Sequence, residues 1–573
     1  MFYNSVEDIE RLLLQSSDEE NYADFSDSDE EAEIIETADH SSESEQSCVD
    51  WDEVKGMPHD GCHFYVGKDQ ETLWINNALA LTGKPKREYN QPGPKCNGRE
   101  AKTETESFLK LFDSEIIDYV IANTNKYINN KRSSVNYSRA RVCEKEQEGN
   151  YSVIFQDEIT ALLGALFLIA VQKGGRTNIL ELWASSGTGL IILRAAFSYK
   201  HFLFLLRSLK FDDTSTRKEQ LVTAIGNLHS AFLINCINNY SPGEFTTIDK
   251  MLDPFHGRCG FVQYMPNKPV MYGLKLYALC DSKTFYTFNF EVYCSRQNPG
   301  PYFAPNQPMD IVKRLVEPIK GTHRNVTTDN YYSSYPAALH LLENGLTFIG
   351  TLKKNKKEIT PECLPNRSRE IGNCLFGFQD DNCLVSCQTK RNKAVLFPSS
   401  MHGTAEIDTA TGKSVVNLDY NTTKGGVDTV DYMCTSYSTQ RTTRRWSLAL
   451  FFRYLDIAGI NSQVLFFASN PEKRTYLTNL ALALMDCHLK ERAQLSTLPR
   501  DIQGYLSPNQ PIPANHDETV RRCGRCHLCS GKKKIKLLSL VIAAKDSFAS
   551  NIATMLLHVM IAELLRKKKV CHS

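Results

Sequence analysis

The stretch from Glu244 to Leu352 constrains the fold of this 573-residue chain more than any other part. Its first three runs, EFTTIDKML, GLKLYALCDS and FYTFNFEVYC, are apolar or alternate with a period of two, which is typical of strands. PMDIVKRLVEPI then has helical spacing, with Ile311, Leu315 and Ile319 on one face. RNVTTDN predicts a fourth strand, SYPAALHLLENG a helix that ends at Gly345, and LTFIGTL a fifth strand. The predicted order is three strands, helix, strand, helix, strand.

This order is that of the ribonuclease H-like (retroviral integrase-like) α/β fold. Two acids occupy its chemical positions, because Asp249 lies late in the first strand and Asp329 at the end of the fourth. Carboxylates at the ends of adjacent strands can converge on divalent ions that lie roughly 3.5–4 Å apart. Any sheet of this size also has an aspartate at some strand end, so neither acid identifies a catalytic site by itself.

The formal net charge of +0 hides a strong asymmetry. Residues 1–54 contain 19 Asp and Glu with one Arg, whereas the remainder has 65 basic and 47 acidic residues. An acidic tail on a basic body predicts that the body binds a polyanion. The composition of residues 1–52 cannot bury a core, so we expect this tail to be disordered.

The sequence favours an intracellular protein that does not enter a membrane. Its N-terminus lacks the basic and apolar regions of a secretory signal. The longest apolar run, Ala161 to Val171, is too short to span a bilayer. The 18 cysteines therefore predict reduced thiols, with scope for a metal site.

Helical and β-rich segments flank the 244–352 stretch. Apolar helical patterns predict core helices between residues 106 and 240, and residues 447–495 are expected to pack back onto 105–243. Residues 358–418 look β-rich and fit an insertion between fold elements. Such an insertion explains why a third acid, expected after strand five, appears only at Asp428.

The run TTKGGVDTVDYM resumes the catalytic core. Gly425 and Gly426 allow close backbone approach, and VDTVDYM predicts a helix start. Asp428 and Asp431 are three positions apart and share a helical face. The alternative is that these acids lie in the first turn of the helix only because negative charge there interacts favourably with the helix dipole.

Basic residues follow the fifth strand and precede the last helical region. Four lysines lie within GTLKKNKKEITP, at Lys353, Lys354, Lys356 and Lys357. Arg441, Arg444 and Arg445 precede Trp446, and arginines beside an aromatic suit a displaced base and its phosphates. The alternatives are a solvated basic face and, for Trp446, a core residue at a helix start.

Long motifs in this chain closely resemble those of the piggyBac transposase family. They are TTIDKMLDPFHGRCGFVQYMPNKPVMYGLKLYALCDS, NVTTDNYYSSYP and YNTTKGGVDTVDYMC, and the resemblance extends from about Phe108 to Cys529. It implies a DNA transposase with a DDD triad, carried over by motif to Asp249, Asp329 and Asp428. The matching family acid at Asp431 lies near the metals, which are Mg²⁺ or Mn²⁺.

The resemblance also implies partners and an intracellular site of action. The family's partners are transposon-end DNA and TTAA target DNA, and its helical domain dimerises, so a homodimer is expected. Basic residues corresponding to Lys353, Lys354 and Lys356 contact DNA in the family, and the tryptophan matching Trp446 stacks at the hairpin end. The runs GKKKIK and RKKK would suit nuclear import.

Two departures from the family pattern stand out. Lys250 follows the first triad acid, where the family commonly has Glu. The C-terminal tail offers Cys523, Cys526 and Cys529 as candidate Zn²⁺ ligands, but tetrahedral closure needs more ligands than this tight run supplies. The tail therefore predicts an incomplete zinc finger with no compact cross-braced structure.

The predicted domains follow the chain in this order: an acidic disordered tail and linker (1–104), a helical dimerisation and DNA-binding domain (105–243), a catalytic domain (244–357), a β-rich insertion (358–418), the second catalytic part with the third Asp (419–440), the second helical part (441–500), a linker (501–521) and the cysteine-rich tail (522–573). Three functions fit them. The first is a metal-dependent DNA transposase that excises DNA through a hairpin and integrates at TTAA. The second is a domesticated, catalytically silent DNA-binding protein, and the third a ribonuclease H-like nuclease that does not transpose.

Overall fold

The computed structural model of the protein divides into two compact units, residues 1–507 and residues 508–573. It describes residues 64–76, 91–138, 154–212, 225–266, 271–295, 305–473 and 475–507, with short strands at 36–37, 46–47, 523–525 and 536–538. In the second unit, β16 (Cys523–Arg525) and β17 (Lys536–Leu538) pair antiparallel. All other described elements belong to the first unit.

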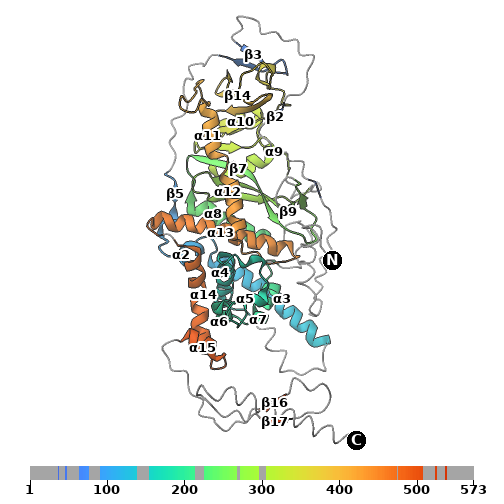
Figure 1. Ribbon diagram of the computed structural model, residues 1–573, viewed down its shortest axis with the longest axis vertical. Coiled ribbons are helices and arrows are strands. Elements are labelled where there is room, and N and C mark those ends of the chain that lie inside the picture. The colour runs from blue at the N-terminus through green and yellow to red at the C-terminus, as the bar shows by residue number, and fades with distance from the viewer. Residues whose placement is uncertain are drawn as a thin grey trace, which may run out of the picture. The chain divides into compact units, whose positions relative to one another are not determined.

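A mixed sheet forms the centre of the first unit (Figure 1). Its strands are β7 (Phe245–Pro254), β8 (Val262–Tyr264), β9 (Tyr272–Asp281), β10 (Thr287–Val292), β11 (Asn325–Thr328) and β12 (Thr347–Gly350). β9 pairs antiparallel with β7, β8 and β10, whereas β11 pairs parallel with both β7 and β12. The predicted order of strands and helices is confirmed, with the short β8 as an addition.

Two helices connect the later strands, α9 (Pro308–Val316) and α10 (Tyr335–Glu343). Ile311 and Leu315 of α9 are buried, as is Ile319 in the 3-10 turn that follows, so the predicted apolar face lies in the core. The Ser334 hydroxyl caps α10 by accepting a hydrogen bond from the Ala337 amide at 3.2 Å. Gly345 follows α10 with a φ of +66°. Glycine adopts this conformation readily and other residues rarely do, so a glycine suits the turn that ends the helix.

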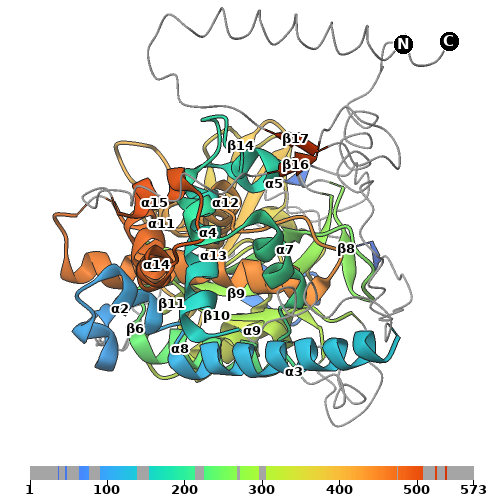
Figure 2. The same ribbon diagram turned by 90° about the horizontal axis from the view of Figure 1, so that it is seen from below.

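Helices that precede the sheet in the sequence pack against helices that follow it (Figures 1 and 2). They are α2 (Glu104–Leu109), α3 (Ser114–Ser138), α4 (Gln156–Val171), α5 (Ile179–Leu182), α6 (Ile191–Ala196), α7 (Tyr199–Ser208), α8 (Gly226–Asn239), α13 (Trp446–Ser469), α14 (Leu477–Ala493) and α15 (Arg500–Leu506). α14 packs closely on α4, because a Cβ added at Gly164 would lie 2.6 Å from the Ala481 carbonyl oxygen. The expectation that the last helices return to the first helical region is confirmed.

The predicted β-rich segment is a three-stranded meander of β13 (Cys374–Gln379), β14 (Asn382–Lys390) and β15 (Lys393–Ser399). It joins the central sheet where Ser399 pairs with Ile349 of β12. A hydrophobic cluster that includes Phe378, Val385 and Phe397 lies apart from the main core. The meander thus has a core of its own although its backbone continues the sheet.

Parts of the N-terminal region pair with these strands. β3 (Phe64–Val66) and β4 (Leu73–Ile75) form a hairpin against β13, where the sequence predicted an irregular linker. β1 (Glu36–Thr37) pairs with β8 and β2 (Gln46–Ser47) with β15, so the prediction of disorder is wrong at these residues. Strand addition needs only main-chain hydrogen bonds, which explains why the polar composition did not reveal it. Among the described residues, no helix is both long and apolar enough to span a membrane.

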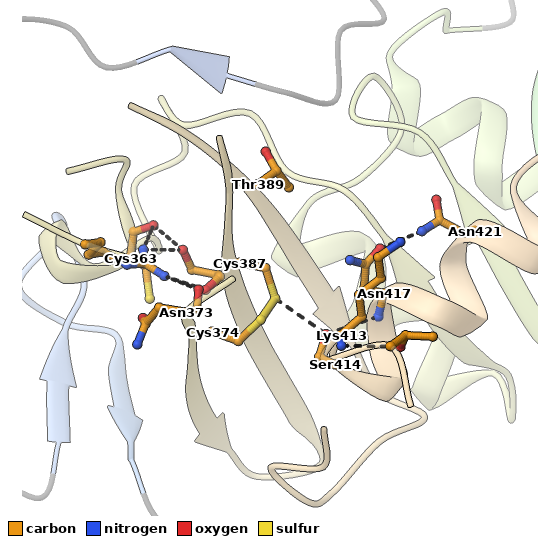
Figure 3. Close-up of a disulfide and its surroundings, with 12 residues drawn as sticks. Cys363, Asn373, Cys374, Cys387, Thr389, Lys413, Ser414, Asn417 and Asn421 are labelled. Carbon is orange, nitrogen blue, oxygen red and sulfur yellow. Dashed lines mark hydrogen bonds between the residues drawn. A yellow bond between two sulfur atoms is a disulfide. The ribbon is translucent and has the colours of Figure 1, made fainter. Parts of the chain in front are cut away.

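One cysteine pair is oxidised, which corrects the prediction of reduced thiols. Cys374 on β13 and Cys387 on β14 form a disulfide (Figure 3). The two residues are direct partners in the antiparallel register, with Cα atoms 4.2 Å apart, so the strand pairing brings their sulfurs together. The Cys387 sulfur also lies 3.5 Å from the hydroxyl of Ser414.

A buried ion network connects α13 to the sheet and to α12 (Gly426–Ser436). The Arg453 guanidinium lies 2.8 Å from the Asp253 carboxylate of β7 and 3.2 Å from the Asp431 carboxylate of α12. The side chains of Arg453 and Asp253 are only 2% and 4% exposed. Such a network holds its elements firmly because losing one partner leaves an unpaired buried charge.

We predict that Arg453→Met destabilises the protein by about 3–5 kcal/mol, since it leaves the buried Asp253 carboxylate without its counter-charge. Urea unfolding of the full chain would measure this, with Arg500→Met at an exposed position as the matched control. Adding Asp253→Leu to Arg453→Met is expected to recover part of the loss. An Arg453→Met variant as stable as the control would contradict the structural role of the network.

Candidate active site

The register of two parallel strands brings Asp249 and Asp329 together. The last residue pair between β7 and β11 is Ile248 with Thr328. Asp249 and Asp329 each come one residue later, so the two residues lie at the same level on neighbouring strands, although β7 continues beyond Asp249. Two amides hold the Asp329 carboxylate, and the closer, that of Tyr331, donates to it at 2.9 Å.

The third acid, Asp428, lies in the first turn of α12. This helix packs on β7 at Gly426, where an added Cβ would lie 2.7 Å from the Thr247 hydroxyl oxygen. The same hydroxyl donates a 2.6 Å hydrogen bond to the Thr423 carbonyl. Contact with one strand residue therefore fixes the start of α12, two residues before Asp428.

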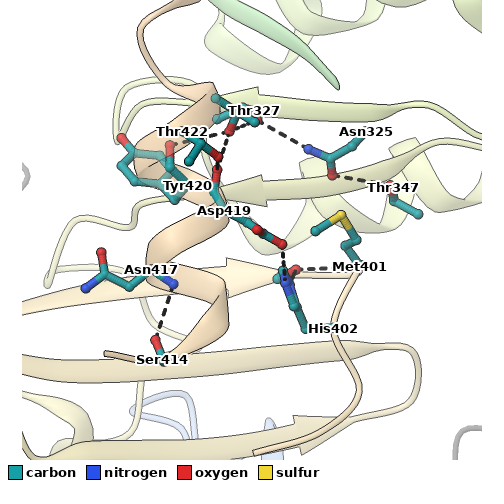
Figure 4. A network of polar contacts seen from close by, with 12 residues as sticks. Asn325, Thr327, Thr347, Met401, His402, Ser414, Asn417, Asp419, Tyr420 and Thr422 are labelled. Atoms are coloured by element: carbon teal, nitrogen blue, oxygen red, sulfur yellow. Dashed lines mark hydrogen bonds and ion pairs between the residues drawn. The ribbon is translucent and has the colours of Figure 1, made fainter. Parts of the chain in front are cut away.

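A polar network positions the preceding helix, α11 (Val415–Thr423) (Figure 4). The Thr327 hydroxyl of β11 donates to the Thr423 hydroxyl at 2.8 Å. His402 lies 3.0 Å from the Asp419 carboxylate and 2.8 Å from the Ser399 hydroxyl, which ties α11 to the end of β15. The β-rich insertion thus leads the chain back onto the strand that precedes Asp329.

The three acids form one electrostatic group. Burial raises the pKa of Asp249 to about 7, and the negative charges of Asp329 and Asp428 add to this shift while Lys250 opposes it. Carboxylates whose pKa values are raised by burial and by each other are common in functional sites. The structure brings the predicted triad residues together, and their catalytic role remains a prediction.

Lys250 lies within this group of acids. Its ammonium nitrogen is 3.5 Å from Asp249 Oδ1 and 3.3 Å from Asp329 Oδ2, and its side chain is 4% exposed. Burial opposes the charged form, but the two carboxylates raise the pKa of Lys250 overall. Neighbouring side chains on a strand point to opposite faces, so position 250 alone does not require a contact with either acid, yet the Lys250 ammonium reaches both.

The carboxylate oxygens of the three aspartates are suitable ligands for a hard cation, but their arrangement in this structure is not suitable. Carboxylate oxygens are the ligands that Mg²⁺ and Mn²⁺ prefer. Among the described residues, however, no group of three or more His, Cys, Asp or Glu side chains has the geometry to hold a metal ion. With the Lys250 ammonium between Asp249 and Asp329, the site does not fit a divalent ion that bridges those two acids.

Asp431 has a different neighbour from the one predicted. Its carboxylate lies 3.2 Å from the buried Arg453 guanidinium. Asp428 contributes to the raised pKa of Asp249, whereas Asp431 contributes to that of Asp253. The placement of Asp431 beside Arg453 does not favour the predicted role as a metal ligand.

The three arginines before α13 differ in their surroundings. Arg441 donates hydrogen bonds to the carbonyls of Gly174, Gly175 and Thr177, the shortest at 2.7 Å. Arg445 donates to the carbonyls of Arg207 and Leu209. These two guanidinium groups join the turn to the helical region, while Arg444 is exposed. DNA contact by the three arginines remains a prediction.

Trp446 begins α13 and is half-buried. Its ring packs edge-on against Phe261, with centroids 5.2 Å apart. The residue is neither fully exposed nor enclosed in the helical core, so this placement leaves the predicted stacking on DNA untested.

The lysine loop, residues 353–357, is supported by the β3–β4 hairpin. The Trp74 indole donates to the Glu358 carbonyl at 2.9 Å, and the Asp69 amide to the Lys357 carbonyl at 3.1 Å. The Lys68 ammonium donates to the Lys354 carbonyl at 2.5 Å, which adds another positive charge beside the loop. The hairpin was not predicted from the sequence, where the short runs FYV and LWI, made of β-branched, aromatic and apolar residues, were the available signal.

The structure gives no side-chain position for the predicted zinc ligands. Cys526 and Cys529 lie outside the described residues, and for Cys523 the structure describes only its place in the β16 backbone. Zinc binding by the tail and the absence of a compact finger remain predictions.

Comparisons with known proteins agree with the geometry. A family model described as Transposase IS4 matches residues 103–463. The structure is also similar to that of a piggyBac transposase synaptic complex with hairpin DNA, determined by cryo-EM, with a TM-score of 0.67. The two chains are 32% identical, and the match covers 77% of this chain and 94% of the other.

We predict that Gly426→Ala lowers stability by about 1–3 kcal/mol, because the new methyl group overlaps Thr247 and pushes α12 away from β7. Gly425→Ala is the matched control, since the nearest atom to its added Cβ is 3.9 Å away. Chemical unfolding of both variants would measure the difference. Equal stability of the two variants would show that the contact at Gly426 does not hold α12.

Proposed function

This chain belongs to the piggyBac-like family of DNA transposases, and we propose that it cuts and rejoins DNA with Asp249, Asp329 and Asp428 as its acidic triad. The observation that carries the proposal is the placement of Asp249 and Asp329 at one level on neighbouring parallel strands, with Asp428 in the first turn of the helix that packs on β7. The strand order, with β11 and β12 parallel to β7 and with β9 antiparallel to it, supports a ribonuclease H-like catalytic domain.

The proposed reaction is a series of phosphoryl transfers. Water attacks a phosphodiester at the transposon end, and the bond to the 3′ oxygen breaks, which leaves a 3′-OH and a 5′-phosphate. That 3′-OH attacks a phosphodiester of the opposite strand, displaces the 3′ oxygen of the flanking DNA and closes a hairpin. Water then hydrolyses the hairpin and restores the 3′-OH, which attacks a phosphodiester at TTAA and displaces a 3′ oxygen of the target strand. The hairpin is supported by the relative, whose structure was determined with hairpin DNA, and TTAA by the resemblance of motifs.

Divalent metal is part of the family's chemistry and bears on the proposal. Mg²⁺ or Mn²⁺ would supply Lewis acidity at the phosphate, and the oxygens of the three aspartates would be its protein ligands. Because Lys250 occupies the space between two of them, we derive no step through a metal.

The DNA surface that we propose includes the lysine loop, the exposed Arg444 and the half-buried Trp446. Basic residues neutralise phosphates, and an aromatic ring accepts an unstacked base. We propose further that the chain works as a homodimer, because two transposon ends must be held together before both are joined to target DNA. We propose the nucleus as its site of action.

A second candidate function is DNA binding without strand cleavage, as in a domesticated transposase. Lys250 favours it, since a lysine paired with two of the triad acids is unlike a site prepared for metal. The two functions share the DNA-binding surface and differ in what happens to the bound strand.

We expect Asp249→Asn and Asp428→Asn to lower nicking by about a hundredfold or more, because each replacement removes a carboxylate that would hold Mn²⁺ or accept the proton of the attacking water. The substrate is a labelled duplex carrying the genomic sequence that flanks the coding region, assayed with Mn²⁺. Asp486→Asn, at an exposed position, is the control. Nicking by the Asn variants at the wild-type rate would refute the triad. Tight binding without nicking by the wild type would favour the second function.

A separate prediction concerns the lysine loop. Replacing Lys353, Lys354 and Lys356 by Ala should weaken duplex binding and reduce the slope of log K against log salt by about 3, if each contacts one phosphate. Fluorescence anisotropy over a salt series would measure the slope. The control variant replaces the exposed Lys283, Lys473 and Lys490, which removes the same charge elsewhere. An equal change in both variants would mean that only net charge matters.

A further inference from the structure

Lys250 differs from an ordinary buried lysine in the number and identity of its partners. The ammonium nitrogen lies 3.5 Å from one triad carboxylate and 3.3 Å from another. Those carboxylates come from adjacent parallel strands, and their own side chains are 15% and 17% exposed. The positive charge is therefore shared by two of the three acids, and the lysine side chain is more deeply buried than either of theirs.

The strand register explains how a side chain from the opposite face reaches this place. The described pairing of β7 with β11 ends at Ile248 and Thr328, while β7 continues to Pro254. Beyond Ile248 the β11 side of β7 is no longer covered by a paired strand, so the Lys250 side chain can pass around the edge. Its backbone amide also donates to Asp249 Oδ1 at 2.8 Å, which orients the carboxylate toward the ammonium.

We propose that Lys250 is an internal counter-ion that competes with divalent metal for Asp249 and Asp329 and so controls whether this site can be loaded. The proposal rests on the proposed function in that these acids are taken as the triad. A divalent ion that bridges two carboxylates must lie about 2.0–2.2 Å from an oxygen of each, which places it in the space that the ammonium fills. Metal binding then requires the ammonium to leave and to be resolvated.

The charges predict the direction and size of the effect. The positive charge of Lys250 offsets one unit of the negative charge of the three triad carboxylates before any metal binds. The approaching metal meets a repulsive unit charge at short range, which in a partly buried site is worth more than a tenfold change in affinity. Replacement of Lys250 by a neutral side chain of similar length should therefore tighten metal binding about tenfold or more.

The test measures metal binding by the full-length chain without DNA. Mn²⁺ alone is the probe, titrated by isothermal calorimetry and by the shift in thermal unfolding temperature. Lys250→Met removes the charge and keeps an unbranched side chain, whereas Lys250→Arg keeps the charge. Lys283→Met removes an exposed charge as the matched control. Unfolding curves without metal establish that each variant is folded, and Lys250→Gln replaces Lys250→Met if the latter is not.

The expected result is tighter Mn²⁺ binding by Lys250→Met, with the arginine and control variants like the wild type. Adding Asp249→Asn to Lys250→Met should abolish the gain. Equal Mn²⁺ affinity of the wild type and Lys250→Met would overturn the proposal. Nicking is scored separately: a variant that binds metal tightly and cuts no DNA would count against the proposed function, while the competition by Lys250 would stand.

Discussion

The pairing of Ile248 with Thr328 is the constraint on which the site depends. It sets the residues after Ile248 in β7 and after Thr328 in β11 at one level, where the pairing of the two strands ends although β7 continues to Pro254. Asp249 and Asp329 lie 80 positions apart in sequence, yet their separation in space is set by this single register. A slip of one residue in β7 would turn Asp249 to the other face and leave Asp329 without it. The interaction of Gly426 with Thr247 adds Asp428 to the same arrangement, because it fixes α12 against the same strand.

Two buried cations divide the acids around β7 into separate groups. Arg453 lies against Asp253 and Asp431, and Lys250 lies against Asp249 and Asp329. The first group is structural, because its guanidinium joins α13, α12 and the sheet, and its removal would leave a buried charge. The second lies at the sheet edge, where its carboxylates keep partial exposure. The same pairing of a carboxylate with a cation thus supports the fold in one place and, as we propose, competes with metal in the other.

The sequence predicted what depends on local pattern and missed what depends on partners from distant segments. Periodicity was sufficient for the order of strands and helices and for the buried face of α9, since burial follows the period of each element. Asp431 has the right helical spacing from Asp428, but the rotation between them is enough to direct it to Arg453, 22 residues later. The carbonyl partners of Arg441 come from residues 174–177, and no local sequence pattern predicts a contact between segments so far apart in the chain. The Cys374–Cys387 disulfide likewise depends on a strand register that composition does not encode.

The elements proposed to bind DNA and the acids proposed to cleave it have separate structural supports in this chain. The lysine loop is supported by the β3–β4 hairpin, and the turn that carries Arg444 is joined to the helical region through Arg441 and Arg445. Neither support passes through Lys250, which forms ion pairs with Asp249 and Asp329. A change at position 250 can therefore alter the metal-binding capacity of the site while the elements that would contact phosphates keep their own anchors. If the proposed triad and DNA surface are correct, a DNA-binding protein without cleavage is a short evolutionary step from a transposase, because one buried side chain changes the charge among the acids and leaves the proposed DNA surface in place.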